Sequence, residues 1–514
     1  MKKSTLFLSL AILAAAALAF AAFRTSLPHR ETASSPAWPI PASSLTASSE
    51  LQPAELKLLF PGEPPRDLAE VTRAVEAKLA ADGLPFKLSF TFVDFGQYGN
   101  KEWLLDATGE TYDIGLTSFS DLAGLVAKKA LAPLDEALSR FGREILRNSP
   151  TYAMQGVTVG GKIYGIPRVM PIAEFQSFVQ IRSDLRVKYG IPEIRKAADM
   201  DAYLQAISEH EPGIVPYFYD SGRFLLREYG DVAFLAGNYL NSPVYIDPSD
   251  PLLRVRITYD SDFFRNIMGK LHEWQKKGYT PTFVAATEEM PDPEKAFYEG
   301  KIAATWSVVM KQTERIDAFK AASPEGELEN VYLHPEKPKY LFTGADNILS
   351  VFSTSRHVNE AVAFLNWVRS SQENYDLFTY GIRDVNYKLE GDALSYDGIP
   401  ADKRYVPISW AWDDIRFARF SRYISPEYAA ELRNWDLEAV SSPTLGFVPD
   451  LSPIKSEMAQ LNVVISEYLS KLYDYRTDWD GTMRQFREKL KDAGIDHVAA
   501  ELQEQFDAFH SANR

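Results

Sequence analysis

PEKAFYEGKIAATWSVVMKQTE, residues 293–314, is the stretch that decides the fold. Its pattern predicts a helix over Pro293–Tyr298, a turn at Gly300 and a short apolar strand over Ile302–Trp306. An aromatic residue, Trp306, stands at the end of that strand. Because α/β sheets present ligand-binding groups at the carboxyl ends of their strands, this stretch points to a binding site.

A second informative stretch is FTGADNILSVFSTSRHVNEAVAFLNWVRSSQENYDLFTYGI, residues 342–382. It predicts a strand over Asn347–Phe352, then a polar turn, then an amphipathic helix over Asn359–Val368. Strand and helix again follow one another, which is typical of an α/β fold.

The two stretches together resemble the extracellular solute-binding proteins (family 1) that feed bacterial carbohydrate ABC importers. Phe297, Gly300 and Ala303 fill that family's F-x-x-G-x-x-A pattern, which a strand and a ligand-facing aromatic follow. The resemblance implies a two-lobed α/β fold of the periplasmic-binding-protein type II class. It also implies a binding protein rather than an enzyme, without a cofactor.

The bulk composition agrees with a folded chain of two lobes. A length of 514 residues is too great for one hydrophobic core, and 46% of the residues are apolar. The aromatic fraction is 13%, with 9 Trp, 26 Tyr and 30 Phe. Most of these rings belong in the core, and a minority in a cleft would suit the apolar faces of sugar rings.

The charge of the chain restricts its partners. A net charge of −15 and a pI of about 5.1 argue against nucleic acid or an anionic membrane surface, since both require clustered Lys and Arg. An anionic saccharide would need a local cation, for which Arg66, Arg168 and Arg383 are candidates. With no cysteine, the chain has no disulfide, thiolate metal site or Cys nucleophile.

The N-terminus predicts export. Lys2 and Lys3 precede an apolar run from Leu6 to Phe23, so residues 1–23 are expected to be a signal sequence or, if uncleaved, a membrane anchor. Residues 24–52 are rich in Ser, Pro, Thr and Ala, which predicts a disordered tether. The protein would then lie in the periplasm or on the outer face of the cytoplasmic membrane.

Strands and helices alternate after the tether. The expected strands are Leu56–Phe60, Phe86–Phe92 and Tyr112–Leu116, and the expected helices are Leu68–Leu79, Trp103–Ala107 and one from about Asp121. This alternation favours a parallel sheet covered on both faces. The resemblance assigns 53–165 plus 342–385 to lobe 1 and 166–341 plus 386–514 to lobe 2, with a hinge at Tyr164–Pro167.

The last part of the chain predicts a helical extension. Thr444–Tyr475 and Thr477–Phe509 both have helical spacing, with Asp478 as an N-cap and Gly494 as a helix stop. This part resembles the C-terminal extension of unknown function found in the lipoprotein-like subgroup of the same family.

Two motifs have simpler interpretations than the functional ones they suggest. Gly156–Lys162 has the spacing of a phosphate-binding loop, but Ile163 follows the lysine, so a Gly-Gly hairpin is favoured. The acidic residues around Asp474–Asp480 do not fit the register of a calcium loop, which favours a capped helix start. The pair Asp413-Asp414 is the kind of feature that a glycosidase would use.

Aromatic and polar residues near strand ends are the candidate ligand-binding groups. Alternation in Trp410-Ala411-Trp412 would put both rings on one face if that stretch is extended, and Tyr217 matches a sugar-lining position of maltodextrin-type relatives. The candidates are Trp306, Trp410, Trp412, Tyr217, Asp121, Ser120, Glu63, Arg66 and Glu174. For each aromatic, packing in the core is the alternative.

The sequence therefore predicts the substrate-binding protein of a carbohydrate ABC importer. It would capture an oligosaccharide between two lobes by hinge closure and deliver it to a membrane permease, as a monomer and without nucleic acid. Two alternatives stay open at this point: a secreted glycoside hydrolase or lyase, and a surface or sensory protein that kept the fold.

Overall fold

The computed structural model describes residues 50–512, except residue 175 and the stretches 219–221 and 282–291. The predicted signal sequence or anchor and residues 24–49 of the predicted tether lie outside the described residues. The end of that tether differs from the prediction, because Leu51 is buried in a core and the Gln52 amide donates to Glu360. No helix in the described part of the chain is long and apolar enough to cross a bilayer.

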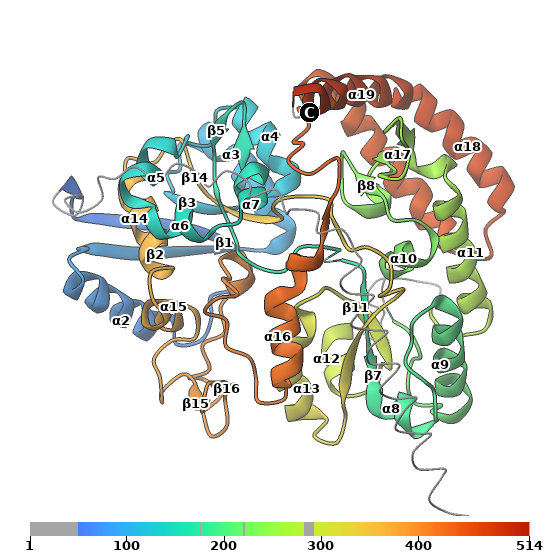
Figure 1. The fold of residues 1–514 in the computed structure, drawn as a ribbon, viewed down its shortest axis with the longest axis horizontal. Coiled ribbons are helices and arrows are strands. Elements are labelled where there is room, and N and C mark those ends of the chain that lie inside the picture. The colour runs from blue at the N-terminus through green and yellow to red at the C-terminus, as the bar shows by residue number, and fades with distance from the viewer. Residues whose placement is uncertain (1–49, 175, 219–221, 282–291, 513–514) are drawn as a thin grey trace, which may run out of the picture. The chain divides into compact units, whose positions relative to one another are not determined.

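Five strands form the sheet of the first lobe, in the order β2-β1-β3-β14-β6 (Figure 1). They are β1 (Ala54–Pro61), β2 (Phe86–Val93), β3 (Ile114–Ser118), β6 (Ile166–Pro167) and β14 (Asn347–Val351). β1 is parallel to β2 and β3, whereas β14 is antiparallel to β3 and β6. The expected parallel sheet is therefore mixed, because its last two strands arrive from the crossings between lobes.

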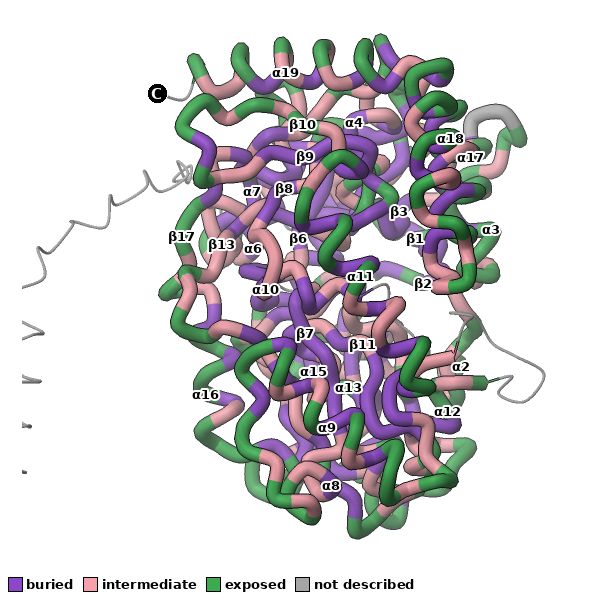
Figure 2. The backbone as a smooth tube through the Cα atoms, turned by 90° about the vertical axis from the view of Figure 1, so that its right-hand side faces the viewer, coloured by how far each residue is buried: buried purple, intermediate pink, exposed green. Residues whose placement is uncertain are grey.

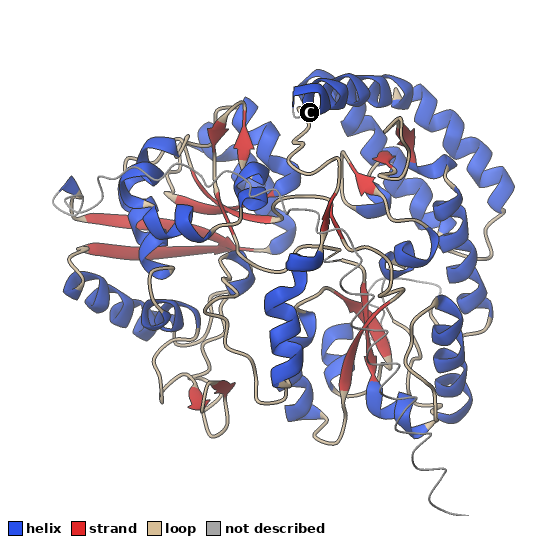
Figure 3. Cartoon of the chain, viewed as in Figure 1, coloured by secondary structure: helices blue, strands red, loops and turns tan. Residues whose placement is uncertain are grey.

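Helices cover both faces of this sheet (Figure 3). They are α2 (Leu68–Ala81), α3 (Phe95–Thr108), α4 (Phe119–Ala127), α5 (Asp135–Phe141), α6 (Arg143–Asn148), α7 (Thr151–Gly156), α14 (Val358–Val368) and α15 (Gln372–Thr379). α2 buries Val71, Val75 and Leu79, which lie one turn apart on a single face. The Asp94 side chain caps α3 by accepting from the amide of Gly96 at 2.8 Å.

The second lobe contains two antiparallel sheets of three strands each, in the orders β11-β7-β12 and β10-β9-β8. The strands are β7 (Phe178–Arg182), β8 (Ala233–Phe234), β9 (Val244–Ile246), β10 (Val255–Ile257), β11 (Ala304–Ser307) and β12 (Leu328–Tyr332). The helices are α8 (Ser183–Lys188), α9 (Ala197–His210), α10 (Leu226–Tyr229), α11 (Asp262–Lys276), α12 (Pro293–Tyr298), α13 (Lys311–Ala322) and α16 (Pro426–Asn434). The bounds of α12 match the prediction, because Asp292 caps it and a proline occupies its first turn.

Short elements complete the chain. The 3-10 turns are η2 (Arg223–Leu225), η3 (Tyr239–Asn241), η4 (Thr258–Asp260), η5 (Ser409–Ala411), η6 (Trp435–Glu438) and η7 (Ser452–Ile454). The short strand pairs are β4 (Thr158–Val159) with β5 (Lys162–Ile163), β13 (Tyr340–Leu341) with β17 (Val440–Ser441), and β15 (Lys388–Glu390) with β16 (Ala393–Ser395). Between β4 and β5, Gly160 and Gly161 both have positive φ, which confirms a hairpin rather than a phosphate loop.

Three helices form the C-terminal extension: α17 (Lys455–Leu472), α18 (Trp479–Asp492) and α19 (Ile495–Ala512), drawn in red in Figure 1. Asp478 caps α18, which confirms a capped helix start, and Gly494 separates α18 from α19 with φ of 89°. The first of these helices begins later than the predicted Thr444. Figure 2 shows exposed and buried residues alternating along α19, whose buried side chains join the core of the second lobe.

The chain crosses between the lobes at neighbouring segments. β6 pairs with β14, and the next residue but one, Val169, exchanges backbone hydrogen bonds with Asp413 and Ile415. The core of the first lobe also includes Tyr405 and Trp412, although the predicted boundaries give residues 386–514 to the second lobe. Residues of these crossing segments, including Arg168 and Asp346, line the cavity described below.

Candidate functional site

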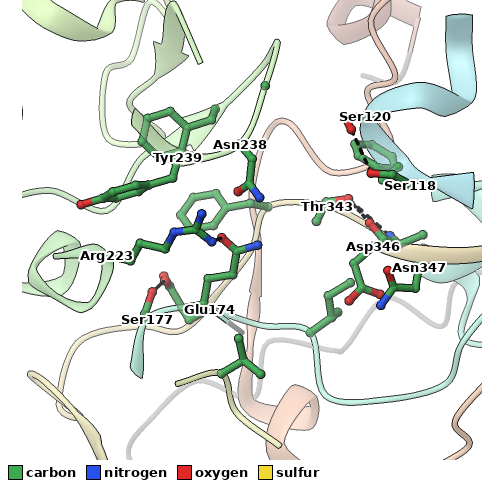
Figure 4. Close-up of a pocket in the computed structure, with 18 of the residues that line it drawn as sticks. Ser118, Ser120, Glu174, Ser177, Arg223, Asn238, Tyr239, Thr343, Asp346 and Asn347 are labelled. Atoms are coloured by element: carbon green, nitrogen blue, oxygen red, sulfur yellow. Dashed lines mark hydrogen bonds between the residues drawn. The ribbon is translucent and has the colours of Figure 1, made fainter. Parts of the chain in front are cut away.

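A cavity of about 610 Å³ has walls from both lobes. Figure 4 shows Ser118, Ser120 and Asn347 of the first lobe facing Arg223 and Tyr239 of the second across it. A volume of this size falls within the roughly 300–1,000 Å³ typical of small-molecule sites. The cavity therefore has the volume expected of a ligand-binding cleft, and residues of both lobes line it.

The first-lobe wall presents polar groups where two strands meet. Ser118 ends β3 and lies opposite Asn347, the first residue of β14. The hydroxyls of Ser118 and Ser120 lie 2.9 Å apart, and the Phe119 amide donates to the Asp346 carbonyl at 2.9 Å. Because the strand ends at this point, its last polar side chains turn toward the cavity rather than the core.

An aromatic pair adds an apolar platform to the same wall. The rings of Phe95, at the start of α3, and Trp410, in η5, stack with centroids 6.3 Å apart and planes 26° apart. Phe95 is 60% exposed although it is large and apolar. Gly62 leaves room for this ring, since a Cβ there would lie 3.1 Å from it. Such an exposed stacked pair suits the apolar face of a sugar ring.

An ion pair connects the crossing segments under the cavity. Arg168 donates from Nε to Asp346 at 2.7 Å and makes a second, parallel bond to the other carboxylate oxygen. The same guanidinium donates to the Trp410 carbonyl at 3.4 Å. Arg168 lines the cavity, but its charge is already compensated by Asp346 in a bidentate pair.

The second-lobe wall contains an arginine stacked on a tyrosine. The Arg223 guanidinium lies 5.3 Å from the ring centre of Tyr239 and donates to the Gln176 side-chain oxygen at 2.7 Å. Tyr239 has φ of 54°, a conformation that L-residues with side chains rarely adopt. Strain of this kind gathers at binding sites, where the surrounding structure imposes it.

Glu174 lines the cavity and is held by its own lobe. Its carboxylate accepts from the Ser177 hydroxyl at 2.9 Å and from Arg227 at 3.4 Å. Arg227 is fully buried and also donates to backbone carbonyls of the loop before β13. Burial raises the pKa of Glu174 to about 7, and the charge of Arg227 opposes that rise. Glu174 itself has φ of 50°, a conformation that is uncommon for residues with side chains.

Trp306 reaches the cavity from the end of β11, where the sequence predicts a ligand-facing aromatic. Lys311 and Arg315 lie over its ring, with centroid distances of 5.3 Å and 5.2 Å. Lys311 in turn pairs with Glu314 at 3.1 Å. These cations cover part of the ring and hold it in one orientation.

The charges that line the cavity balance. The cations are Arg168, Arg223 and Lys311, and the anions are Glu174, Glu314 and Asp346. Arg168 and Lys311 are paired with anions of this set, and Glu174 with the buried Arg227. The remaining polar lining includes the uncharged side chains of Ser118, Ser120, Gln176, Ser177, Asn238, Tyr239, Thr343, Asn347 and Thr444. Such groups exchange hydrogen bonds with hydroxyls without requiring a charged ligand.

Four of the nine candidate residues line the cavity: Trp306, Trp410, Ser120 and Glu174. Asp121 lies one residue beyond Ser120 in α4 and is absent from the lining. Glu63 and Arg66 are exposed in the loop after β1, outside the cavity, and Arg383 is likewise exposed. Of the polar candidates, Ser120 and Glu174 therefore line the cavity, whereas Asp121, Glu63 and Arg66 do not.

Two aromatic candidates are core residues, which corrects their assignment to the cleft. Trp412 is 3% exposed, packs on Phe60 and Phe378, and donates to the Thr379 hydroxyl. Because residues 409–411 form a 3-10 turn and not a strand, Trp410 and Trp412 point in different directions.

Tyr217 is the other buried candidate. It is 1% exposed and makes edge contacts with Phe224 and Trp274 in the core of the second lobe. An aromatic that follows a proline satisfies a family pattern equally well in the core or on the cleft.

Sequence reasoning missed several cavity residues. Phe95, Arg223, Tyr239 and Phe447 all line the cavity. The capping Asp94 marks the start of α3, which would have indicated that Phe95 stands at an exposed helix end. Nothing in the local sequence indicates the positions of Tyr239 and Phe447, because both depend on contacts between distant segments.

Within the described residues, no group of three or more His, Asp or Glu is placed to hold a metal ion. The paired acid Asp414 is fully buried and bonded to Arg416, whereas Asp413 accepts from the Tyr375 hydroxyl. Burial raises the pKa of Asp413 to about 6, and the charge of Arg168 opposes it. Neither carboxylate lines the cavity, so the pair does not form a glycosidase site there.

Comparison with known proteins gives a match to one domain, a relative and a fold. Residues 443–511 match the model of DUF3502, a domain of unknown function. A protein of Streptococcus pneumoniae serotype 4 (strain ATCC BAA-334 / TIGR4), named carbohydrate ABC transporter substrate-binding protein, is 24% identical over 451 residues. That match covers 86% of this chain and 87% of the relative.

Solved structures show the same fold. The N-glycan transport solute binding protein (NgtS) of Streptococcus pneumoniae has a TM-score of 0.75 and 20% identity, covering 90% of this chain and 100% of that one. The same protein in complex with Man1GlcNAc has a TM-score of 0.72 and 21% identity over the same shares. The chain thus has the two-lobed solute-binding-protein fold with a C-terminal match to DUF3502, and it is a homologue of a carbohydrate ABC transporter substrate-binding protein.

Proposed function

We propose that this protein captures a neutral oligosaccharide between its two lobes and delivers it to the permease of an ABC importer. The observation that carries the proposal is the cavity of about 610 Å³, which combines aromatic platforms with uncharged hydrogen-bonding groups. The carbohydrate relatives support the class of ligand.

The choice of a neutral ligand follows from the charge balance of the cavity. An acidic sugar would add negative charge to a cavity whose three cations are matched by three anions, and two of those cations have carboxylate partners. Arg223 instead bonds to a neutral amide oxygen and stacks on Tyr239. In this setting its remaining N–H groups are suited to hydroxyl or amide oxygens of a neutral sugar.

Binding would proceed by closure of the lobes. A ligand that contacts both walls stabilises the closed form by the free energy of those contacts, and the crossing segments around Val169 provide the hinge. The closed, loaded monomer would then dock on its permease, outside the cytoplasmic membrane. No bond of the sugar is broken in this scheme.

Calorimetric titration tests the ligand class. The purified full-length chain is titrated with neutral oligosaccharides, including mannose–N-acetylglucosamine glycans, and with anionic uronate oligomers. Mass spectrometry of each mixture then detects any cleavage. We expect saturable binding of at least one neutral glycan, recovered intact, and weaker or no binding of the anionic set.

Three outcomes would contradict the proposal. Cleaved sugar would show an enzyme, tighter binding of uronate oligomers would show an acidic ligand, and no binding in either set would move the ligand outside these carbohydrates. Delivery is tested separately, because cells that lack this protein should lose uptake of the bound glycan while keeping uptake of other sugars.

A further inference from the structure

The DUF3502 domain contributes residues to the cavity wall. The match to this domain begins at residue 443, and three of its first residues, Thr444, Phe447 and Pro449, line the cavity. Thr444 is buried, whereas Pro449 is half-buried. The domain is thus in contact with the space that the ligand would fill.

Phe447 packs against the last helix of the domain, α19. It is only 7% exposed, and its ring packs against Phe506 at 5.4 Å and Phe509 at 5.5 Å, both on α19. The ring planes of Phe447 and Phe506 are nearly perpendicular, at 86°. An edge-to-face cluster of this kind fixes a ring more firmly than a lone contact does.

The same helices support other parts of the second-lobe wall. α17 contacts η3, which contains Tyr239, and α19 contacts β10. Gln503 on α19 accepts from the Val255 amide at 2.6 Å, so the contact with β10 includes a directed hydrogen bond. Helices and wall share one hydrophobic core, and the wall residue Tyr239 belongs to it.

The start of the domain is also tied to a crossing segment. β17 pairs in parallel with β13, and the Ser442 amide donates to the Leu341 carbonyl at 3.0 Å. The Thr444 hydroxyl donates to the carbonyl of Phe342, itself a cavity residue, at 3.2 Å. These bonds place the segment Thr444–Pro449 at the cavity in a defined conformation.

We propose that DUF3502 is an integral part of the ligand-binding site: Phe447 and Pro449 form an apolar subsite for one sugar residue of a neutral oligosaccharide, and α17 and α19 hold that subsite in place. This inference rests on the proposed function and assigns a role to a domain of unknown function. It differs from a role in docking on a partner, for which outward-facing residues such as Val463 would be used.

Single-cysteine variants test whether the ligand reaches the subsite. Because the chain has no cysteine, P449C introduces a unique thiol at the subsite and V463C a unique thiol on the outer side of α17, where Val463 is 69% exposed. Each full-length variant is labelled with a maleimide dye, with and without a saturating neutral glycan that binds the wild type. We expect the glycan to slow labelling of P449C severalfold and to leave V463C unchanged.

Affinity measurements test the contribution of the ring. F447L keeps an apolar side chain against Phe506 but removes the flat face, and V448A alters the adjacent half-buried residue, which does not line the cavity. We expect F447L to weaken glycan binding by roughly three- to tenfold, consistent with losing one ring contact. V448A should bind like the wild type, and thermal melting reports the stability of each variant.

The outcomes separate this inference from the proposed function. If the wild type binds a glycan but labelling of P449C is unprotected and F447L binds normally, the subsite is overturned while the proposed function stands. If only the melting temperature of F447L falls and P449C stays unprotected, the domain is a support and not a subsite. If the wild type binds no glycan, the proposed function fails and the subsite fails with it.

Discussion

Trp410 and Trp412 are two residues apart, yet they occupy opposite environments. Trp410 stacks on the exposed Phe95 at the cavity, whereas Trp412 lies in the first-lobe core against Phe60 and Phe378. The 3-10 turn at η5 separates their directions. A residue that lines the cavity and a residue of the core are thus separated by a single position.

Alanine substitutions distinguish the two rings. W410A should weaken glycan binding with little loss of stability, since its ring borders the cavity. W412A should lower the free energy of unfolding by about 3–5 kcal/mol, because it leaves a cavity in the core. Titration calorimetry and urea denaturation of both variants check this. Equal effects of the two substitutions on binding would contradict the assignment of Trp410 alone to the cleft.

Glu102 is a buried acid away from the cavity lining. It is 3% exposed, and its carboxyl accepts from the Thr117 hydroxyl at 2.5 Å. Burial raises the pKa of Glu102 from 4.5 to about 8, while the bond from Thr117 lowers it and Asp121 raises it further. The folded state therefore holds this proton more tightly than the unfolded state does.

Because Glu102 binds its proton more tightly in the folded state, its contribution to the free energy of unfolding falls as the pH rises. The contribution of Glu102 to stability is fully present below pH 4.5 and is lost as the pH rises to about 8. The loss has a slope of at most about 1.4 kcal/mol per pH unit. E102Q keeps an acceptor for Thr117 but cannot ionise, so its stability should fall less between pH 5 and pH 8.

Urea denaturation at several pH values measures this difference. E102Q and the wild type should be similar near pH 4.5, and the variant should be the more stable near pH 8. E63Q, which changes an exposed glutamate, serves as the control and should follow the wild type. Parallel curves for E102Q and the wild type would contradict a raised pKa at this position.

The sequence shows which residues could bind a sugar, but it rarely shows whether such a residue lies in the core or at the cavity. Trp306 and Ser120 were predictable, because Trp306 lies near the end of β11 and Ser120 follows the end of β3, and both strand ends border the cavity. Tyr217 was not, since a core and a cleft both accept an aromatic and only tertiary contacts distinguish them. Phe447 and Tyr239 depend on contacts with α19, η2 and other distant segments, which no local pattern encodes.

Among the elements, α7 packs unusually closely on the crossing segment before β14. A Cβ added to Gly344 would lie 2.0 Å from the carbonyl oxygen of Tyr152 and 3.0 Å from the amide of Gly156. Both obstructions are backbone atoms, so no side chain can move aside. The residues on either side of Gly344 line the cavity, so this contact also positions the site.

Replacing glycine tests the close approach. G344A should lower the free energy of unfolding by about 3 kcal/mol or more, because α7 or the crossing segment must shift. G99A is the matched control: Gly99 lies in α3 with nothing within 4 Å of an added Cβ, so alanine should stabilise by about 0.5–1 kcal/mol. Urea denaturation checks both, and a G344A variant as stable as the wild type would contradict this packing.

Several elements were predictable, although α3 begins at Phe95 and not at the predicted Trp103. Apolar spacing defines α2, and capping residues mark the starts of α12 and α18; the predicted and observed starts of all three agree within two residues. The mixed sheet was not predictable, because strand direction in β14 and β6 depends on how the chain returns between lobes. Thr444–Leu451 lacks the predicted helix, since this segment lies along the crossing segment and the cavity instead.

For the whole molecule, the length and the family resemblance were enough to predict two lobes, which the comparisons with solved structures confirm. The predicted lobe boundaries differ from the packing. Tyr405 belongs to the first-lobe core, although the predicted boundaries give residues 386–514 to the second lobe. Under the proposed function, a ligand would gain contacts from both lobes only when they close on it. The free energy of the ligand contacts would then favour the closed arrangement of the lobes over the open one.

Amide hydrogen exchange with and without a bound neutral glycan tests most directly whether the protein captures a sugar between its two lobes. The ligand should slow exchange on both walls at once, at the start of α4 and β14 in the first lobe and around η2 and η3 in the second. Helices far from the cavity, such as α9, should exchange at unchanged rates. Protection confined to one lobe, or located away from these segments, would contradict capture of the sugar between the two lobes.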